Sequence, residues 1–215
     1  MCGSASVTTP LRQESPRAVA RPRTPLISLD LVVEAATHIL ETEGLHALSL
    51  RALGAKLNVN SASLYHHFAN KEEILLAVAR AALREITLPP MGEDWANWIC
   101  ENSIAYRRTL VKKPFLLELI LSGIRPRTVA YAMTDAKLIE AGVADQLRPE
   151  FLVALDCAVI GSALVSIHAA QISNTPQETH FDHEDILRHT IQLLVRDMIA
   201  QSQKIERSRK HINRH

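Results

Sequence analysis

Residues 44–71 limit the possible folds of this chain more than any other segment, because they encode two short helices with almost no residues between them. Ser49 is a favourable N-terminal cap, and the leucines of the stretch LRALGAKL that follows it recur on one helical face. Asn58 tolerates a left-handed backbone, so the first helix is expected to end there and a second to begin almost at once. The segment therefore predicts a helix–turn–helix.

The second helix is expected to combine an apolar inner side with a polar outer side. Leu64 and Phe68 lie four residues apart and should point inward. The remaining surface carries mainly short or polar side chains: Ser61, Ala62, Ser63, Tyr65, His66 and His67. Short side chains let a helix approach base edges closely, and alanine can contact a thymine methyl group. We therefore expect this helix to enter the major groove of double-stranded DNA.

The longest motif of the chain is SLYHHFANKE, residues 63–72. It resembles the T-L-Y-x-x-F-x-x-K-E signature of the TetR family of bacterial transcriptional regulators, and the resemblance extends without a gap over roughly residues 26 to 75. It implies an all-α protein in which a three-helix helix–turn–helix head is joined by a fourth helix to a C-terminal body. In that family the body binds a small-molecule effector and dimerises.

Caps and helix breakers place the boundaries. Ser28 should cap the first helix of the head and Gly44 should end it. Asn70 and Glu73 form a capping box for the fourth helix, which the segment Leu88-Pro89-Pro90 ends. We expect a flexible basic tail at 1–25, a DNA-binding domain at 26–72, an effector-binding and dimerisation domain at 73–203, and a basic tail at 204–215.

The roles of single residues at DNA follow from side-chain chemistry and from the resemblance. Arg51 can bind guanine O6 and N7 in a bidentate manner, as the matching arginine of tetracycline repressors implies; a phosphate contact is the alternative. Ser49 and the free amides near it can hold a phosphate, while Tyr65, His67 and Lys71 are donors that fix register. The complete expected set is Arg23, Ser49, Arg51, Asn60, Ser61, Ala62, Ser63, Tyr65, His66, His67 and Lys71.

Local cations matter because the net charge of the whole chain is only +1. The N-terminal tail carries Arg17, Arg21 and Arg23 among prolines, and it is either an extended arm that reaches DNA or a solvated tail. The C-terminal tail from Lys204 carries five cations and a single carboxylate. We interpret it as a solvated extension, with nonspecific DNA contact as the alternative.

A pocket for the effector is expected in the body, because bulky apolar and aromatic side chains recur there. The candidates are Trp95, Trp98, Tyr106, Phe115, Leu121, Ile124, Tyr131 and Met133. Ordinary core packing explains the same residues. The step Gly123-Ile124-Arg125-Pro126 resembles tetracycline repressors, but Leu121 stands where those have a magnesium-binding histidine and Ile124 where they have a hydroxyl residue. An unidentified, largely apolar effector is therefore expected, and not tetracycline.

The segment 149–173 is almost entirely apolar and long enough to cross a bilayer. Asp156 and His168 within it argue for a helix buried on two sides of a soluble dimer, and against a membrane partner. A last amphipathic helix at 183–204 would complete a four-helix interface between two copies of the chain. The expected interface residues are Leu155, Ala158, Val159, Ser162, Val165, Ile191, Leu194 and Met198.

No catalytic residue, metal site or cofactor is expected. The sequence contains neither G-x-S-x-G nor a phosphate-binding glycine loop. The adjacent histidines 66 and 67 diverge by about 100° on a helix, and His180 with His183 fits a solvated helix start better than a metal site. The scattered cysteines Cys2, Cys100 and Cys157 suit a reducing compartment, so a cytoplasmic location is expected.

These observations together predict a sequence-specific DNA-binding transcriptional regulator. The form expected is a homodimeric repressor that binds a two-fold symmetric operator and is released by its effector. A regulator that binds DNA constitutively is the first alternative. A helical enzyme that uses the body is the second, although no motif of the sequence supports it.

Overall fold

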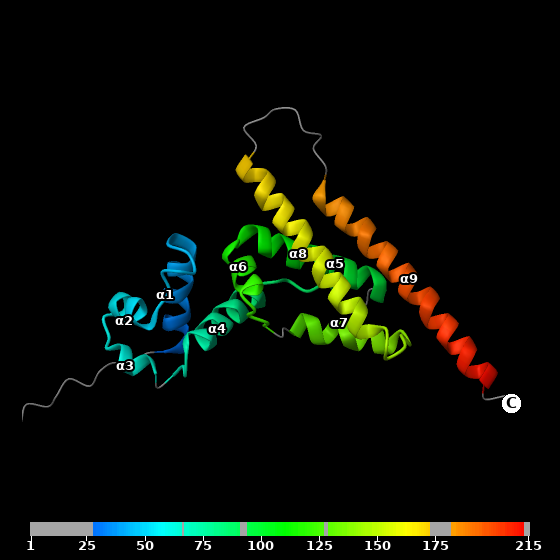
Figure 1. The fold of residues 1–215 in the computed structure, drawn as a ribbon, viewed down its shortest axis with the longest axis horizontal. Helices are drawn as coiled ribbons and strands as arrows, with labels where there is room; N and C mark the ends of the chain where they lie inside the picture. The colour runs from blue at the N-terminus through cyan, green and yellow to red at the C-terminus, as the bar shows by residue number, and fades with distance from the viewer. Residues whose placement is uncertain (1–27, 66, 91–93, 127–128, 173–181, 213–215) are drawn as a thin grey trace, which may run out of the picture.

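The computed structural model describes residues 28–65, 67–90, 94–126, 129–172 and 182–212. Every regular element in this part of the chain is an α-helix, which confirms the expected all-α fold (Figure 1). The N-terminal tail with Arg23, the side chain of His66, and His180 lie outside the described residues. The helices are α1 Leu29–Thr42, α2 Leu50–Leu57, α3 Ser61–Leu64, α4 Lys71–Arg84, α5 Trp95–Lys112, α6 Phe115–Leu121, α7 Val129–Glu140, α8 Arg148–Ile172 and α9 His183–Ile212.

Helices α1 to α4 form the head, at one end of the long axis of the molecule (Figure 1). Ser28 Oγ accepts a hydrogen bond from the Leu31 amide at 3.2 Å and caps α1, as predicted. Gly44 follows the end of α1 with φ +83°, a conformation that favours glycine. The core of the head is made of apolar side chains that are almost fully buried: Val32, Ala36, Ile39, Leu53, Leu64, Phe68, Ile74 and Val78.

The start of α4 is a capping box one residue wider than expected. Asn70 Oδ1 accepts from the Glu73 amide at 2.9 Å, and the Glu73 carboxylate accepts from the amide of Ala69 at 2.7 Å. Helix α4 then ends at Arg84, several residues before the two prolines that were expected to end it. It is the helix that connects the head to the body (Figure 1).

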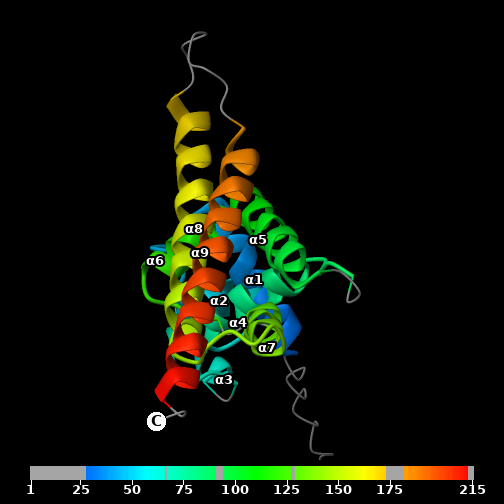
Figure 2. The same ribbon diagram turned by 90° about the vertical axis from the view of Figure 1, so that its right-hand side faces the viewer.

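The body is built around α5, which packs against both α8 and α9. The two long helices run side by side in both views, with α6 to one side of α8 and α7 near its lower end (Figures 1 and 2). Side chains that are fully buried fill the centre of the body: Trp98, Ile99, Ile104, Leu110, Leu116, Leu119, Leu138, Leu187 and Ile191. A single hydrophobic cluster continues from the head into the body.

Helix α8 is apolar but only partly covered. Among the described helices it alone, over Arg148–Ala170, is long and apolar enough to cross a membrane, with a mean hydropathy of 1.9. Only 28% of this segment is buried within the subunit. One side of α8 therefore packs on α5 and α9, and the other side carries apolar side chains that nothing in the subunit covers.

Candidate nucleic-acid interface

The helix–turn–helix is formed by α2, a tight turn and α3. Ser49 Oγ accepts from the Ala52 amide at 3.1 Å, and Asn58 adopts φ 54° and ψ 45°, so both predicted boundaries of α2 are confirmed. Helix α3 is shorter than expected, since it ends at Leu64. One more turn follows α3, because the Phe68 amide donates to the Leu64 carbonyl at 3.0 Å. The Phe68 side chain is buried in the core of the head.

Gly54 sets the distance between α2 and the turn that leads into α3. Its carbonyl accepts from the Val59 amide at 2.8 Å, and the residue is buried. A Cβ at this position would lie 3.0 Å from both Ser61 Oγ and the Val59 carbonyl oxygen. Glycine therefore permits a contact that alanine would strain, and this contact holds the first residue of α3 against α2.

The predicted DNA-binding residues that the structure describes form one polar surface of the head. Ser49, Arg51, Asn60, Ala62, Tyr65 and His67 are exposed, whereas Ser61, Ser63 and Lys71 are half-buried. The exposed fraction of Tyr65 is 58%, which is high for an aromatic side chain and has no explanation in packing. Asn60 Oδ1 accepts from the Ala62 amide at 3.0 Å, so its carbonyl group caps α3 while its amide group stays available.

Lys71 has a structural contact that the sequence did not indicate. Its Nζ donates to the Leu45 carbonyl oxygen at 3.2 Å, which ties the start of α4 to the segment between α1 and α2. The two residues are 26 positions apart, and no local pattern connects them. The ammonium group keeps two further donors.

Acidic side chains gather on another part of the head, away from α2 and α3. A surface hollow of about 430 Å³ lies between α1 and α4 and is lined by Asp30, Glu34, Glu41 and Glu85, together with Lys113 of the body. Lys113 Nζ forms an ion pair with Glu85 at 2.6 Å, across the junction of head and body. Carboxylates repel phosphates, so this hollow is unsuited to DNA, and the surface made by α2 and α3 is the better candidate.

The eight candidates for an effector pocket differ in how deeply they are buried. Trp98 and Phe115 are core residues: the Trp98 Nε1 donates to the Pro89 carbonyl at 3.1 Å, and Lys137 Nζ lies 5.1 Å from the centre of the indole. Leu121 and Tyr131 are exposed, and the half-buried candidates are Trp95, Tyr106, Ile124 and Met133. Their assignment to one pocket stays a prediction, because neither helical spacing nor burial tells a core side chain from one that lines a cavity.

Three polar residues of the body, Tyr106, Arg125 and Asp156, interact with one another, which the sequence did not indicate. Partial desolvation raises the pKa of the Asp156 carboxyl on α8, and Arg125 opposes this shift. Burial, and then the nearby Asp156, raise the pKa of Tyr106 on α5. Tyr106, Arg125 and Asp156 thus bring a donor, a cation and a carboxylate together beside the candidate residue Ile124.

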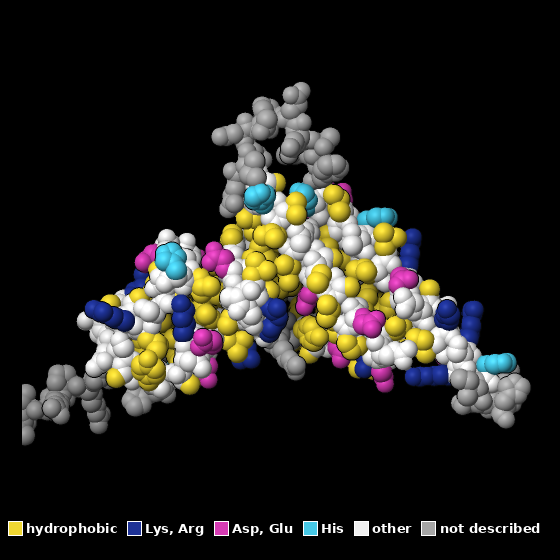
Figure 3. All heavy atoms as spheres, in the orientation of Figure 1, with side chains coloured by type: hydrophobic (Ala, Val, Ile, Leu, Met, Phe, Trp, Pro, Cys, Tyr) yellow, Lys and Arg dark blue, Asp and Glu magenta, His cyan; other side chains and the backbone are white. Residues whose placement is uncertain are grey.

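Four of the eight expected interface residues are already buried within the subunit, so they cannot reach a partner as placed. Leu155, Val159, Ile191 and Met198 are buried within the subunit, and Ala158, Ser162 and Leu194 are half-buried. Val165 alone of the eight is exposed. The segment is apolar all round, so its sequence could not indicate which side faces α5. The exposed apolar residues, called here the α8/α9 face, are Val153, Cys157, Leu164, Val165, Ile186 and Leu193 (Figure 3).

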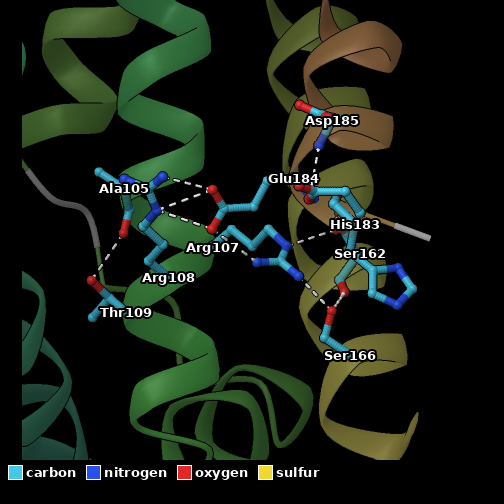
Figure 4. Close-up of polar contacts among 10 residues, drawn as sticks. Ala105, Arg107, Arg108, Thr109, Ser162, Ser166, His183, Glu184 and Asp185 are labelled. Atoms are coloured by element: carbon cyan, nitrogen blue, oxygen red, sulfur yellow. Dashed lines mark hydrogen bonds and ion pairs between the residues drawn. The ribbon is translucent and has the colours of Figure 1, made fainter. Parts of the chain in front are cut away.

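Ser162 has a different partner from the one expected. It belongs to a polar cluster around Arg107, a buried guanidinium of α5 that donates to Ser162 Oγ at 2.9 Å, to Glu184 Oε1 at 3.3 Å and to Ser166 Oγ (Figure 4). Arg108 reaches the same glutamate from solvent, at 2.6 Å. These contacts hold α8 and α9 against α5. The sequence did not indicate them, because the partners are 55 to 77 residues apart.

Comparison with known proteins identifies the head. A family model described as bacterial regulatory proteins, tetR family, matches residues 32–78, from α1 through α3 into α4. The tetracycline repressor protein class D of Escherichia coli is 26% identical over 178 residues, which cover 80% of this chain and 81% of that protein. The chain belongs to the TetR family.

Solved structures extend this similarity over the body. BioQ of Mycobacterium smegmatis is 28% identical with a TM-score of 0.67, and the match covers 81% of this chain and 98% of that one. A BioQ structure with its natural double-stranded DNA operator has a TM-score of 0.62 and 27% identity, covering 80% and 98%. A TetR variant of Acinetobacter baumannii AYE in complex with minocycline has a TM-score of 0.66 and 26% identity, covering 82% and 98%.

This TetR-family chain is accordingly a DNA-binding transcriptional regulator with a helix–turn–helix. The family assignment made from residues 63–72 is confirmed, and the family match includes all of α2 and α3. The assignments of single residues to bases and phosphates remain predictions.

Proposed function

We propose that this regulator is a homodimeric repressor that binds a two-fold symmetric operator and is released from it by a small molecule. The observation that carries the proposal is the combination of two uncovered surfaces: the polar surface of α2 and α3, and the apolar α8/α9 face. One α3 can cover only a few base pairs, so two copies are needed for specific binding. The repressor names of relatives and the operator-bound BioQ structure support the proposal.

At DNA, α3 is proposed to lie in the major groove. Arg51 reads a guanine, while Tyr65, His67 and the remaining donors of Lys71 hold phosphates. The Ser49 hydroxyl hydrogen and the free amides at the start of α2 bind a further phosphate. The DNA-binding domain is proposed to span residues 26–72, and the effector-binding and dimerisation domain residues 73–203.

The proposed dimer contact is the α8/α9 face. In a single subunit, the six apolar side chains of this face would be exposed to water. Soluble proteins rarely leave an apolar surface of this size uncovered. Gly161 lies on the same part of α8, and a Cβ there would meet no atom within 4 Å. Small residues of this kind allow two helices of different subunits to approach closely.

The proposed effector site lies in the body around Tyr106, Arg125 and Asp156. Apolar surroundings with a few converging polar groups are typical of small-molecule sites. The neighbour solved in complex with minocycline supports binding of a small molecule, although its drug is not assigned to this chain. A ligand that prefers the conformation with badly spaced heads lowers operator affinity by that preference, typically about 1 to 3 kcal/mol.

The coupling path proposed is α4 with the ion pair of Glu85 and Lys113. Glu85 caps the end of α4, and Lys113 caps the end of α5, so the 2.6 Å contact connects the last turns of the two helices. A shift of α5 on effector binding would therefore move α4 and the head with it. The proposed place of action is the cytoplasm.

The experiment has two arms. Purified protein is incubated with a fragmented genome to select an operator, and its mass in solution is measured by light scattering with and without the substitution Gly161→Leu. We expect an enriched operator and a dimer, and we expect G161L, whose Cβ would meet no atom within 4 Å in its own subunit, to be monomeric and to lose operator preference. A wild-type monomer without preference for any fragment would end the proposal.

The effector is tested separately. Compounds that raise the melting temperature are added to the operator complex, and release is followed by fluorescence anisotropy. Release by a compound that fails to act on Asp156→Asn supports the proposed site. If every stabilising compound leaves the complex intact, the protein is a constitutive regulator.

A further inference from the structure

The last part of α9 projects from the body. Met198 is buried, and Ser202 Oγ still accepts from the Ala144 amide at 3.1 Å. From residue 203 to 209 every side chain except that of Ile205 is exposed. The helix continues to Ile212, so about ten residues, or roughly 15 Å, extend beyond the last contact with the body (Figure 1).

This projecting end is strongly basic. Lys204, Arg207 and Arg209 are exposed, and within the described part of the chain none of them takes part in an ion pair. The whole chain has a net charge of only +1, whereas residues 204–215 contain five cations and one carboxylate. Long cationic side chains without partners on a rigid helix suit a polyanion.

The position of this end relative to α3 suggests that the polyanion is the same DNA duplex that α3 contacts. Figures 1 and 2 share a vertical axis, and both place the last turns of α9 at the same end of the molecule as α3. The two elements are separated along the long axis of Figure 1. A duplex that contacts α3 and runs along this axis would therefore also pass the end of α9.

We infer that the projecting end of α9 is a second DNA-binding element, in which Lys204, Arg207 and Arg209 contact backbone phosphates outside the base pairs read by α3. The inference rests on the proposed binding of DNA by α3. These contacts carry no sequence information, and they lengthen the DNA segment that the protein covers. In a two-fold dimer each contact occurs twice.

The test compares two triple variants that lose the same charge. The first is Lys204→Gln, Arg207→Gln and Arg209→Gln. The matched control is Arg84→Gln, Lys112→Gln and Arg196→Gln, three exposed cations outside this end of α9. Both are titrated onto a long duplex that carries the selected operator, and onto random duplex of equal length, between 50 and 200 mM KCl.

We expect the first variant to bind both duplexes more weakly and to keep its preference for the operator. Each phosphate contact contributes about 0.9 to the slope of log K against log salt, so three contacts per subunit predict a slope reduced by up to about 5. The control should keep the wild-type slope. On a duplex trimmed to the base pairs under the two α3 helices, the wild type and the first variant should have similar affinities and similar salt slopes.

Two results would overturn the inference. The first is an unchanged salt slope in the first variant with intact operator preference, which leaves the proposed function standing. The second is a change in dimer dissociation without a change in slope, which would assign the three cations to the partner subunit. Failure of the wild type to prefer any operator would instead contradict the proposed function.

Discussion

Arg107 and Arg108 are neighbours that bind the same carboxylate, yet we predict very different contributions to stability. Arg108 makes the shorter contact with Glu184, 2.6 Å against 3.3 Å for Arg107. The Arg107 side chain is only 8% exposed, whereas that of Arg108 is 63% exposed. If burial governs the strength of these pairs, Arg107 is the important residue; if distance governs it, Arg108 is.

The magnitude follows from the partners. Arg107→Met removes charge-assisted hydrogen bonds from a buried group while filling most of its volume. Ser162 and Ser166 keep their bonds to carbonyl oxygens, and Glu184 keeps Arg108, so no partner is stranded. The 3.3 Å contact with Glu184 is the longest of the three bonds and is left out of the sum, so the two charge-assisted bonds to Ser162 and Ser166, at about 1.5 kcal/mol each, give a loss of about 3 kcal/mol. Arg108→Ala removes an exposed pair worth about 0.5 kcal/mol.

The assay is thermal unfolding at one fixed protein concentration, followed by circular dichroism. A chain of this length loses about 2 to 4 °C per kcal/mol, so R107M should melt about 6 to 12 °C lower and R108A about 1 to 2 °C lower. Urea unfolding provides the free energies independently. An equal or larger loss in R108A would refute the argument that burial outweighs distance here.

Three further outcomes are expected. Arg51→Ala should weaken operator binding and relax base preference, whereas Tyr65→Phe should weaken binding to operator and random duplex alike; equal losses on both duplexes for both variants would contradict base reading by the arginine. Leu164→Glu places a charge on the α8/α9 face and should yield a soluble monomer in sedimentation velocity, so a stable dimer would exclude that face. The hydrogen bond from Arg108 holds the pKa of Glu184 below its ordinary 4.5, so its stabilisation is complete above that pH and is lost as the pH falls through the lowered value. Glu184→Gln should flatten this part of the stability profile in acid unfolding experiments, and an unchanged profile would mean that the pair is not formed in solution.

Local features of the fold were predictable because their causes lie within a few residues. The caps Ser28, Ser49 and Asn70 each accept a hydrogen bond from the amide three residues further on, and Asn58, in the left-handed conformation that asparagine tolerates, ends α2. The family motif spans ten consecutive residues. Helix α3 is shorter than the pattern indicated, since the burial of Phe68 needs only a turn after Leu64.

Features that depend on distant residues were not predictable. The buried side of α8 packs on α5, where Arg107 binds Ser162 and Ser166, 55 and 59 positions away. An apolar helix offers no period from which to choose a side. The same limit applies to Trp98. Its partners, the Pro89 carbonyl and Lys137, lie outside its own helix, so the sequence could not indicate them.

The uncovered side of α8 has a consequence for how the protein is made and kept. If the proposed dimer forms, a newly synthesised subunit exposes the apolar side of α8 until it meets a second copy, so dimerisation competes with aggregation. Folding and pairing then become one equilibrium, in which the amount of protein acts like a stabilising ligand. The melting temperature should then rise with protein concentration. In a cell that contains few copies, the subunits would have the lowest stability of that range.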